Sequence, residues 1–306
     1  MSKKNRKINN IILIIIVIIL LGGLLILFKN DIKNIFNKNN DTKEEKPLDD
    51  EKDKEEEIDP LKEYKETSNY KLINTDRYIA YKGNNPDLSY EDVVTRVNIG
   101  LDKDFYSLIT PADTSKGNLL LMNKYLKLAS DYEPNDLEEV KSECFISGNL
   151  YVRNMRKEAK EAFERLCTDS KANGTPVYGQ SGYRPYSMQE KLYNSAVKNS
   201  GQKVADSDTA RPGHSEHQTG LTMDVSSTKG GNMLSFHKTE SFTWMQNNAH
   251  KYGFILRYLD GKTHITGFTY ESWHYRYVGI ETATDIHNNY PNLTYDEYYY
   301  KFIDNK

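Results

Sequence analysis

Four residues in the second half of the chain have the types and spacing of a metal site. Asp224 follows His217 by seven residues, and the motif Glu271-Ser-Trp-His274 comes further along the chain. A catalytic zinc site takes three protein ligands from histidine and carboxylate side chains and leaves a fourth position for water. His217 and Asp224 can supply two ligands if the chain turns at Gly220 and re-enters as a strand, and His274 can supply the third.

Glu271 has the chemistry of a general base for such a site. A bound metal lowers the pKa of a water molecule from about 15.7 to about 7, so a nearby carboxylate can accept its proton. Of the seven histidines, His214 lies only three residues before His217 and competes with it for the same ligand position. Spacing alone does not choose between these two histidines.

The elements that must position these residues are short and of mixed type. Residues 220–226 alternate in polarity and predict a strand that carries Asp224, and residues 263–278 predict a hairpin of strands around Gly267. Without a regular βαβ rhythm, the pattern predicts an α+β fold with a small, mainly antiparallel sheet and flanking helices. The other expected elements are helices over 151–167, over 187–197 with a capping box of Ser187 and Glu190, and over 241–252 before Gly253, and a loop with a short strand over 175–183.

Several motifs resemble the zinc D-alanyl-D-alanine carboxypeptidases of the VanY type. The two that carry the candidate metal ligands are SEHQTGLTMD at 215–224 and ESWH at 271–274. Upstream, SGYRPYSMQ at 181–189 is similar to the Ser-Gly-Tyr-Arg segment of the same family. The likeness covers about residues 92–280, in the family's order, and includes LLLMNKY at 119–125 and DYEPNDL at 131–137.

This resemblance implies one zinc ion held by His217, Asp224 and His274, with Glu271 as the general base. It favours His217 over His214 as the first ligand. The fold it implies is that of the zinc D,D-peptidases, which agrees with the α+β pattern read from the residues.

The resemblance also implies roles for three further residues. Arg184 corresponds to the arginine that polarises the scissile carbonyl, and a fixed guanidinium aimed at developing negative charge lowers the barrier. Ser215 and Gln189 correspond to positions that line the substrate pocket. The chain departs from the family pattern at Ser272, where proline is frequent, and at Pro185, where a small polar residue is common.

The expected function is hydrolysis of the terminal peptide bond of a peptidoglycan stem peptide, which releases the last D-alanine. An L,D-carboxypeptidase acting on tetrapeptide stems shares these motifs and stays open as an alternative. An endopeptidase that cuts cross-links, or a wall-binding module with a structural zinc, are further alternatives. The last of these has no use for Glu271 or Arg184, because a structural zinc site closes its fourth position.

A membrane anchor is expected near the N-terminus. Residues 11–28 form an uncharged apolar run whose helix would span about 27 Å, and residues 1–10 carry the lysines and arginine of a cytoplasmic flank. A cleaved signal peptide is the alternative. We expect residues 29–67 to form a charged tether and residues 68–306 to form the catalytic domain outside the cell membrane, facing the cell wall.

Composition limits the partners of the chain. In 306 residues, 41 Lys+Arg stand against 44 Asp+Glu, and the net charge of −3 argues against nucleic acid as a partner. Cys144 and Cys167 can form a disulfide outside the cell, and two buried free thiols are the alternative. Residues 70–118 are expected to extend the domain or to cap its cleft, and the tyrosines at 298–300 are expected to lie on a packed C-terminal helix.

Overall fold

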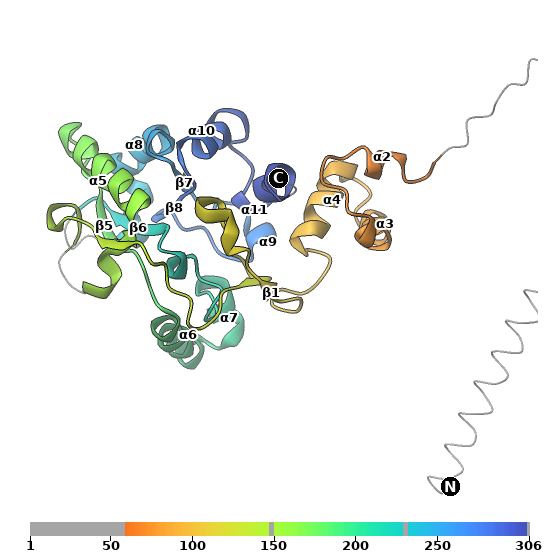
Figure 1. Cartoon of the computed structure of the whole chain (residues 1–306), viewed down its shortest axis with the longest axis horizontal. Coiled ribbons are helices and arrows are strands. Elements are labelled where there is room, and N and C mark those ends of the chain that lie inside the picture. Colours follow the sequence, from red (N-terminus) through yellow and green to blue (C-terminus); the bar gives the residue numbers. More distant parts are fainter. Residues whose placement is uncertain (1–58, 147–149, 229–231, 305–306) are drawn as a thin grey trace, which may run out of the picture. The chain divides into compact units, whose positions relative to one another are not determined.

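A four-stranded antiparallel sheet in the order β5-β6-β8-β7 forms the centre of the fold (Figure 1). The computed structural model describes residues 59–146, 150–228 and 232–304. Two pairs of very short strands, β1 with β2 and β3 with β4, lie outside the main sheet. The strands are β1 (Thr110–Pro111), β2 (Leu126–Lys127), β3 (Leu137–Glu139), β4 (Asn154–Arg156), β5 (Tyr178–Ser181), β6 (Thr222–Ser226), β7 (Phe254–Leu256) and β8 (His274–Tyr277).

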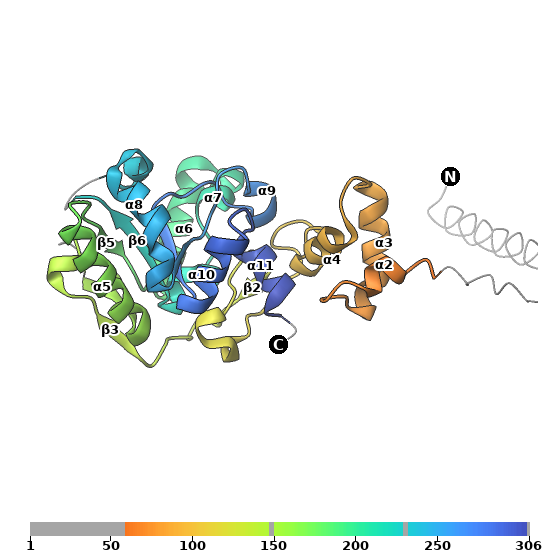
Figure 2. The same ribbon diagram turned by 90° about the horizontal axis from the view of Figure 1, so that it is seen from above.

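Helices flank this sheet, so the expected α+β fold with a small, mainly antiparallel sheet is confirmed. Figure 2 shows α5 and α8 beside the sheet, and these two helices contribute to its main hydrophobic core. The α-helices are α2 (Lys62–Lys65), α3 (Thr75–Asn84), α4 (Tyr90–Ile99), α5 (Lys157–Ala172), α6 (Tyr186–Ser200), α7 (Gln202–Asp208), α8 (Glu240–Asn248), α9 (Thr263–Thr266), α10 (Ile280–Asn289) and α11 (Tyr295–Phe302).

The two faces of the sheet differ in chemistry because side chains alternate along a strand. On β6, Met223 and Val225 point into the hydrophobic core, and on β8 Tyr275 does the same. The opposite face carries Asp224 and His274, which are paired across the two strands. The sheet therefore separates a packed apolar side from a polar side on which chemistry can take place.

A disulfide joins Cys144 to Cys167 of α5, with their Cα atoms 5.8 Å apart. Both residues belong to the main core, and the bond closes a loop with a sequence separation of 23. Loop closure of this size removes conformational entropy from the unfolded chain and stabilises the fold by about 3 kcal/mol. Because the two cysteines form this bond, the alternative of two free thiols is wrong.

The C-terminal helix α11 is packed against the rest of the domain, as expected. Its tyrosines Tyr295, Tyr298, Tyr299 and Tyr300 are all buried and form a second hydrophobic cluster. The helix begins at a capping box in which Thr294 accepts a hydrogen bond from the backbone of residue 297. The aromatic run therefore has a packing role in this structure.

Residues 70–118 extend the domain by packing on α11. Lys301 on α11 lies 3.4 Å from Asp92 of α4, and Lys71 lies 2.5 Å from Asp304. The buried Asn69 side chain donates a hydrogen bond to the carbonyl oxygen of Tyr300. These contacts favour an extension over a cap, and the residues that line the cleft described below begin only at residue 184.

Three details of the expected elements are wrong. The helix predicted over 151–167 begins only at Lys157, because residues 154–156 pair with β3 and become β4. The helix expected from Ser187 begins at Tyr186 with Pro185 at its N-cap, whose φ of −66° suits a helix start, and Ser187 makes no cap. The hairpin over 263–278 does not form, since Gly267 (φ 75°) ends α9 and only β8 is a strand.

The predicted anchor at 11–28 and its flank at 1–10 lie outside the described residues. Within the part of the chain that the structure describes, no helix is long and apolar enough to cross a membrane. Most of the expected tether at 29–67 also lies outside, but α2 falls within that range. Tyr64 of α2 is buried and stacks with Tyr78, so folded structure begins before residue 68.

The buried tyrosines predict a loss of stability at alkaline pH. Burial raises the pKa of Tyr183 and Tyr299 to about 12, against about 10 in the unfolded chain. Below pH 10 both states keep these protons and the stabilisation is complete; it is lost as pH rises from about 10 to about 12. For Tyr183 the difference corresponds to at most about 2.7 kcal/mol.

Urea unfolding at pH 9, 10 and 11, with absorbance at 295 nm to follow phenolate, measures this effect. The urea-unfolded chain is the reference, and its 23 tyrosines should titrate near pH 10. A folded protein whose phenols all titrate at that same pH would contradict the prediction.

Candidate active site

Three buried side chains converge on the polar side of the sheet. His217, Asp224 and His274 each offer one ligand atom, and these atoms lie within 4.8 Å of one another. Nε2 of His217 is 3.3 Å from Oδ2 of Asp224, and Nδ1 of His274 is 3.2 Å from Oδ1 of the same carboxylate. The structure thus brings together the three residues that the sequence nominated as metal ligands.

Local backbone geometry accounts for this convergence. His217 lies in a 3₁₀ helix, η6 (Glu216–Thr219), which ends at Gly220 in the left-handed conformation (φ 68°). This left-handed conformation is what favours glycine at residue 220, and a Cβ atom there would in addition lie 2.8 Å from Cδ2 of Leu137. The chain then enters β6, where Asp224 faces His274 of β8 in the antiparallel register.

The second nitrogen of each imidazole has its own partner. Nδ1 of His217 is 2.7 Å from the carbonyl oxygen of Gly182, which leaves Nε2 to face Asp224. Nε2 of His274 is 3.3 Å from Oε2 of Glu216, which leaves Nδ1 to face Asp224 and Glu271. Metal-bound histidines are held in this way by a carbonyl or carboxylate on the far ring nitrogen.

The electrostatics of the two histidines fit a bound cation. Burial and the nearby guanidinium of Arg184 lower the pKa of His217, so its imidazole is neutral, as a ligand must be. Burial also lowers the pKa of His274, but hydrogen bonds to Asp224, Glu216 and Glu271 outweigh it and raise the net value well above the ordinary one. Carboxylates therefore favour positive charge at this point, and a donor set of two imidazoles and one carboxylate suits zinc.

Glu271 lies at the edge of this group, with Oε2 3.3 Å from Nδ1 of His274. Its backbone nitrogen donates to the carbonyl oxygen of Tyr258 at 3.3 Å, which ties the segment before β8 to the chain after β7. Burial raises the pKa of the Glu271 carboxyl above its ordinary value. A raised pKa brings a carboxylate closer to the range in which it can both accept and return a proton.

Arg184 approaches the same group from the segment between β5 and α6. Its Nη2 is 3.9 Å from Oδ2 of Asp224 and donates to Oγ of Ser181 at 3.0 Å. Its Nη1 donates to Oε1 of Gln189 at 2.7 Å, and the backbone nitrogen of Arg184 donates to the carbonyl oxygen of His217 at 3.1 Å. The guanidinium is therefore fixed in one orientation beside the candidate metal ligands.

Gln189 and Ser215 both line the cleft, as the resemblance implies. Their side chains differ in the hydrogen bonds that they make. Both ends of the Gln189 amide have protein partners, because Nε2 donates to the carbonyl oxygen of Ala210 at 2.7 Å while Oε1 holds Arg184. In this structure Gln189 orients Arg184. The Ser215 side chain makes no capping bond at the start of η6 and lies on the cleft wall.

His214 has a separate environment. Its Nδ1 is 3.0 Å from the carbonyl oxygen of Asn123, and its ring packs edge-on against Tyr106 with centroids 5.0 Å apart. It does not belong to the group of potential ligand atoms around Asp224.

A cleft of about 160 Å³ opens beside these residues. Its wall includes apolar side chains that sequence reasoning left out of the site, among them Trp273, Tyr258 and Phe268. Trp273 could have been found from its place next to His274 in a recognised motif. Tyr258 and Phe268 stand in no motif. They reach the cleft through tertiary packing, since the ring of Tyr258 lies against His274 of β8 (centroids 4.8 Å apart) and Phe268 lies against Tyr258 (5.0 Å).

Comparisons with known proteins identify the family of this chain. The family described as VanY, D-alanyl-D-alanine carboxypeptidase, matches residues 152–280. The putative carboxypeptidase YodJ of Bacillus subtilis (strain 168) is 41% identical over 185 residues, which are 60% of this chain and 67% of that protein. A D-alanyl-D-alanine carboxypeptidase of Enterococcus faecalis (strain ATCC 700802 / V583) is 32% identical over 197 residues, or 61% of this chain and 67% of that protein.

Among solved structures, the LdcB LD-carboxypeptidase is similar in fold and sequence. It shares 38% identity with this chain at a TM-score of 0.58, and the match covers 63% of this chain and 90% of that one. All the residues described above as metal-facing, together with Glu271 and Arg184, fall inside the range matched by the family.

Proposed function

Because the chain belongs to the VanY-type family of D-alanyl-D-alanine carboxypeptidases, we propose that it is a zinc enzyme that removes the C-terminal D-alanine from peptidoglycan stem peptides. The observation that carries the proposal is the convergence of His217, Asp224 and His274 beside Glu271 and Arg184 at one cleft. A binding module with a structural metal has no need of the last two side chains.

The proposed roles follow from position. When bound, zinc would act as a Lewis acid that lowers the pKa of water and polarises the scissile carbonyl. Glu271 accepts the proton of the attacking water and returns it to the amine of the leaving residue. Arg184 is held where its charge can stabilise negative charge on the carbonyl oxygen. Trp273 offers an apolar surface for a small side chain such as the alanine methyl group.

An L,D-carboxypeptidase is the second candidate, and the similarity to LdcB favours it. That protein is described as an L,D-carboxypeptidase, and 90% of its chain is covered by the match. The two activities use the same reacting groups and differ in the configuration of the residue before the scissile bond. Loss of alanine from pentapeptide or from tetrapeptide stems therefore separates them.

The deciding experiment is incubation of the zinc-loaded protein with each of the two muropeptides, followed by mass spectrometry. Loss of alanine from the pentapeptide alone, abolished by a chelator, is the result expected for the D,D-carboxypeptidase. Loss from the tetrapeptide alone would keep the mechanism and change the substrate. No loss from either would shift support to an endopeptidase or a wall-binding module, which cross-linked dimers would then test.

Arg184→Ala is expected to lower kcat about 100- to 1,000-fold while the zinc content stays the same. This is the range for loss of one group that stabilises the oxyanion. Steady-state kinetics and elemental analysis on the same sample measure both quantities.

Arg211→Ala is the matched control for that variant. Arg211 is also partly buried and paired with a carboxylate, Asp206, at 2.8 Å, but it does not line the cleft. Turnover in Arg211→Ala should stay close to that of the wild type. If turnover in Arg184→Ala is also unchanged, Arg184 is a structural residue.

We further propose that residues 11–28 anchor the chain in the cell membrane with the N-terminus in the cytoplasm and the catalytic domain facing the cell wall. The basic residues before the apolar run support this orientation. The Cys144–Cys167 disulfide supports an oxidising location, where such bonds persist. Protease added to intact protoplasts should remove the domain, whereas a protected chain would contradict the orientation.

A further inference from the structure

A cluster of four buried charged side chains lies directly behind His274. It consists of Glu216, Arg257, Arg276 and Asp296, whose side chains are at most 1% exposed. Its two carboxylates and two guanidinium groups balance in charge. The proposed reaction assigns no step to any of the four. Burial of charged side chains is costly unless every group is paired, so the cluster calls for another explanation.

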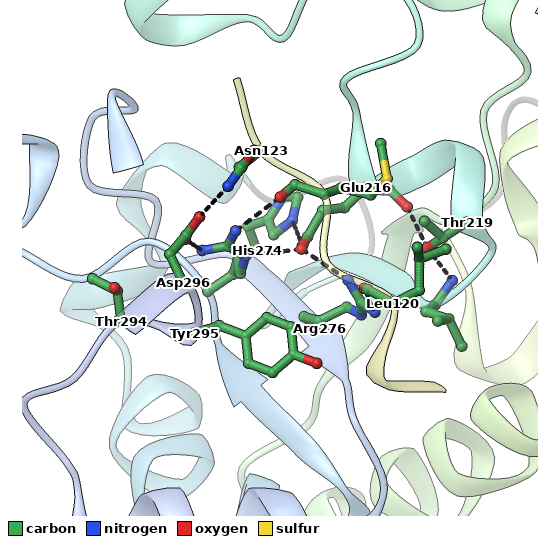
Figure 3. Close-up of polar contacts among 12 residues, drawn as sticks. Leu120, Asn123, Glu216, Thr219, His274, Arg276, Thr294, Tyr295 and Asp296 are labelled. Carbon is green, nitrogen blue, oxygen red and sulfur yellow. Dashed lines mark hydrogen bonds and ion pairs between the residues drawn. The ribbon is translucent and has the colours of Figure 1, made fainter. Parts of the chain in front are cut away.

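The contacts form a continuous chain from the C-terminal helix to the metal-facing histidine (Figure 3). Asp296 on α11 accepts a hydrogen bond from Nη1 of Arg257 at 2.7 Å, and Nε of Arg257 donates to Oε1 of Glu216 at 2.8 Å. Nη1 of Arg276 donates to the same Oε1 at 2.9 Å. Both guanidinium groups thus hold one oxygen of Glu216, and the other oxygen, Oε2, faces Nε2 of His274 at 3.3 Å.

The segment 119–125 supplies three further partners of this cluster. Nη2 of Arg257 donates to the carbonyl oxygen of Met122 at 3.0 Å, and Arg276 donates to the carbonyl oxygen of Leu120. Asn123 donates to Oδ1 of Asp296 at 2.9 Å. The motif at 119–125 is part of the resemblance to the family but holds no candidate reactive side chain. In the structure its carbonyl oxygens and Asn123 bind the buried charged cluster.

We propose that Glu216 is a positioning residue that accepts the Nε2 proton of His274 and thereby presents Nδ1 of that histidine to the metal. Asp296 contributes by fixing Arg257, so α11 helps to preorganise the metal site although it lies beyond the residues that the family matches. A carboxylate on the far nitrogen of a ligating imidazole fixes its tautomer and ring orientation and strengthens metal binding. This inference rests on the metal site of the proposed function.

Zinc affinity, measured by chelator competition, tests the proposal on folded protein. Glu216→Gln should bind zinc about 10- to 100-fold more weakly than wild type, the range for loss of such a partner. Asp296→Asn should show a smaller loss, of about threefold to tenfold. The visible spectrum of the Co(II)-substituted protein should also change in Glu216→Gln, because the orientation of one ligand is altered.

Glu164→Gln is the matched control for these variants. Glu164 is also a buried glutamate with ion pairs, to Lys141 and Lys160, but it lies on α5 in a different part of the fold. Its replacement should lower the unfolding temperature of the apoprotein and leave zinc affinity and the Co(II) spectrum unchanged. Equal zinc affinity in wild type and in a folded Glu216→Gln would overturn the proposal.

A second measurement needs no variant, since removal of Glu216 leaves two buried arginines and can prevent folding. Nitrogen-15 NMR of the zinc-loaded wild-type chain, labelled at histidine, should show His274 protonated at Nε2 and unprotonated at Nδ1. Protonation at Nδ1 would overturn the proposal. Failure of the wild-type chain to bind zinc is a different outcome, because it would reject the proposed function itself.

Discussion

Glu271→Gln is expected to reduce turnover about 100- to 10,000-fold while the protein keeps its zinc. This is the range of rate that a positioned general base contributes. Glutamine has nearly the same size as glutamate and preserves the packing beside His274, but its amide cannot accept the proton of the attacking water. Steady-state kinetics with the muropeptide substrate and elemental analysis of the same sample give the two quantities.

Asp208→Asn provides the matched control for Glu271→Gln. Asp208 is another carboxylate on the cleft wall, and its Oδ1 accepts a hydrogen bond from Thr269 at 3.2 Å. It has no part in the proposed proton transfers, so its amide variant should keep most of the turnover at saturating substrate. A Glu271→Gln variant as active as Asp208→Asn would show that the base is a different group.

His217→Ala should lose nearly all bound zinc and nearly all turnover, whereas His214→Ala should keep its metal. The physical reason is that Nε2 of His217 faces Asp224 at 3.3 Å, while the ring of His214 is occupied by Asn123 and Tyr106. Removal of one of three ligands leaves a site that holds zinc weakly.

Zinc per chain in dialysed samples, measured by elemental analysis, separates the two histidines. Since both are buried and both replacements remove an imidazole, each variant is the control for loss of packing in the other. Metal loss in His214→Ala with retention in His217→Ala would exchange the two assignments. The unfolding temperature of each apoprotein shows whether a loss of metal reflects a loss of fold.

Much of the candidate site was predictable because its spacing is local. The turn at Gly220 and the alternation along β6 follow from short-range rules, so Asp224 could be placed on the strand after His217. The strand at His274 was also predictable, although its partner was wrongly expected to be an adjacent hairpin strand. Gly267 instead ends α9, where Lys124 from a distant segment donates to its carbonyl oxygen.

The supporting residues were not predictable in the same way. Glu216 stands in a recognised motif, yet its role depends on Arg257, Arg276 and Asp296, none of which belongs to a motif recognised in the sequence. Likewise, the helical pattern over 151–167 was locally sound, but pairing with β3 converted residues 154–156 into a strand. In both cases contacts with other segments of the chain, which no local pattern reveals, decided the result.

The amino-acid sequence by itself nominated the candidate reacting groups, and it determined the order of the motifs and the period-two alternation that puts Asp224 and Met223 on opposite faces of β6. These properties depend on residue type and on neighbours within a few positions, where backbone geometry sets the spacing. Only the tertiary structure decided the Asp224–His274 register, the disulfide, and the charges buried behind His274. Those features depend on which distant segments exclude water together, because buried charges and cross-strand pairs are stable only when every partner is in place.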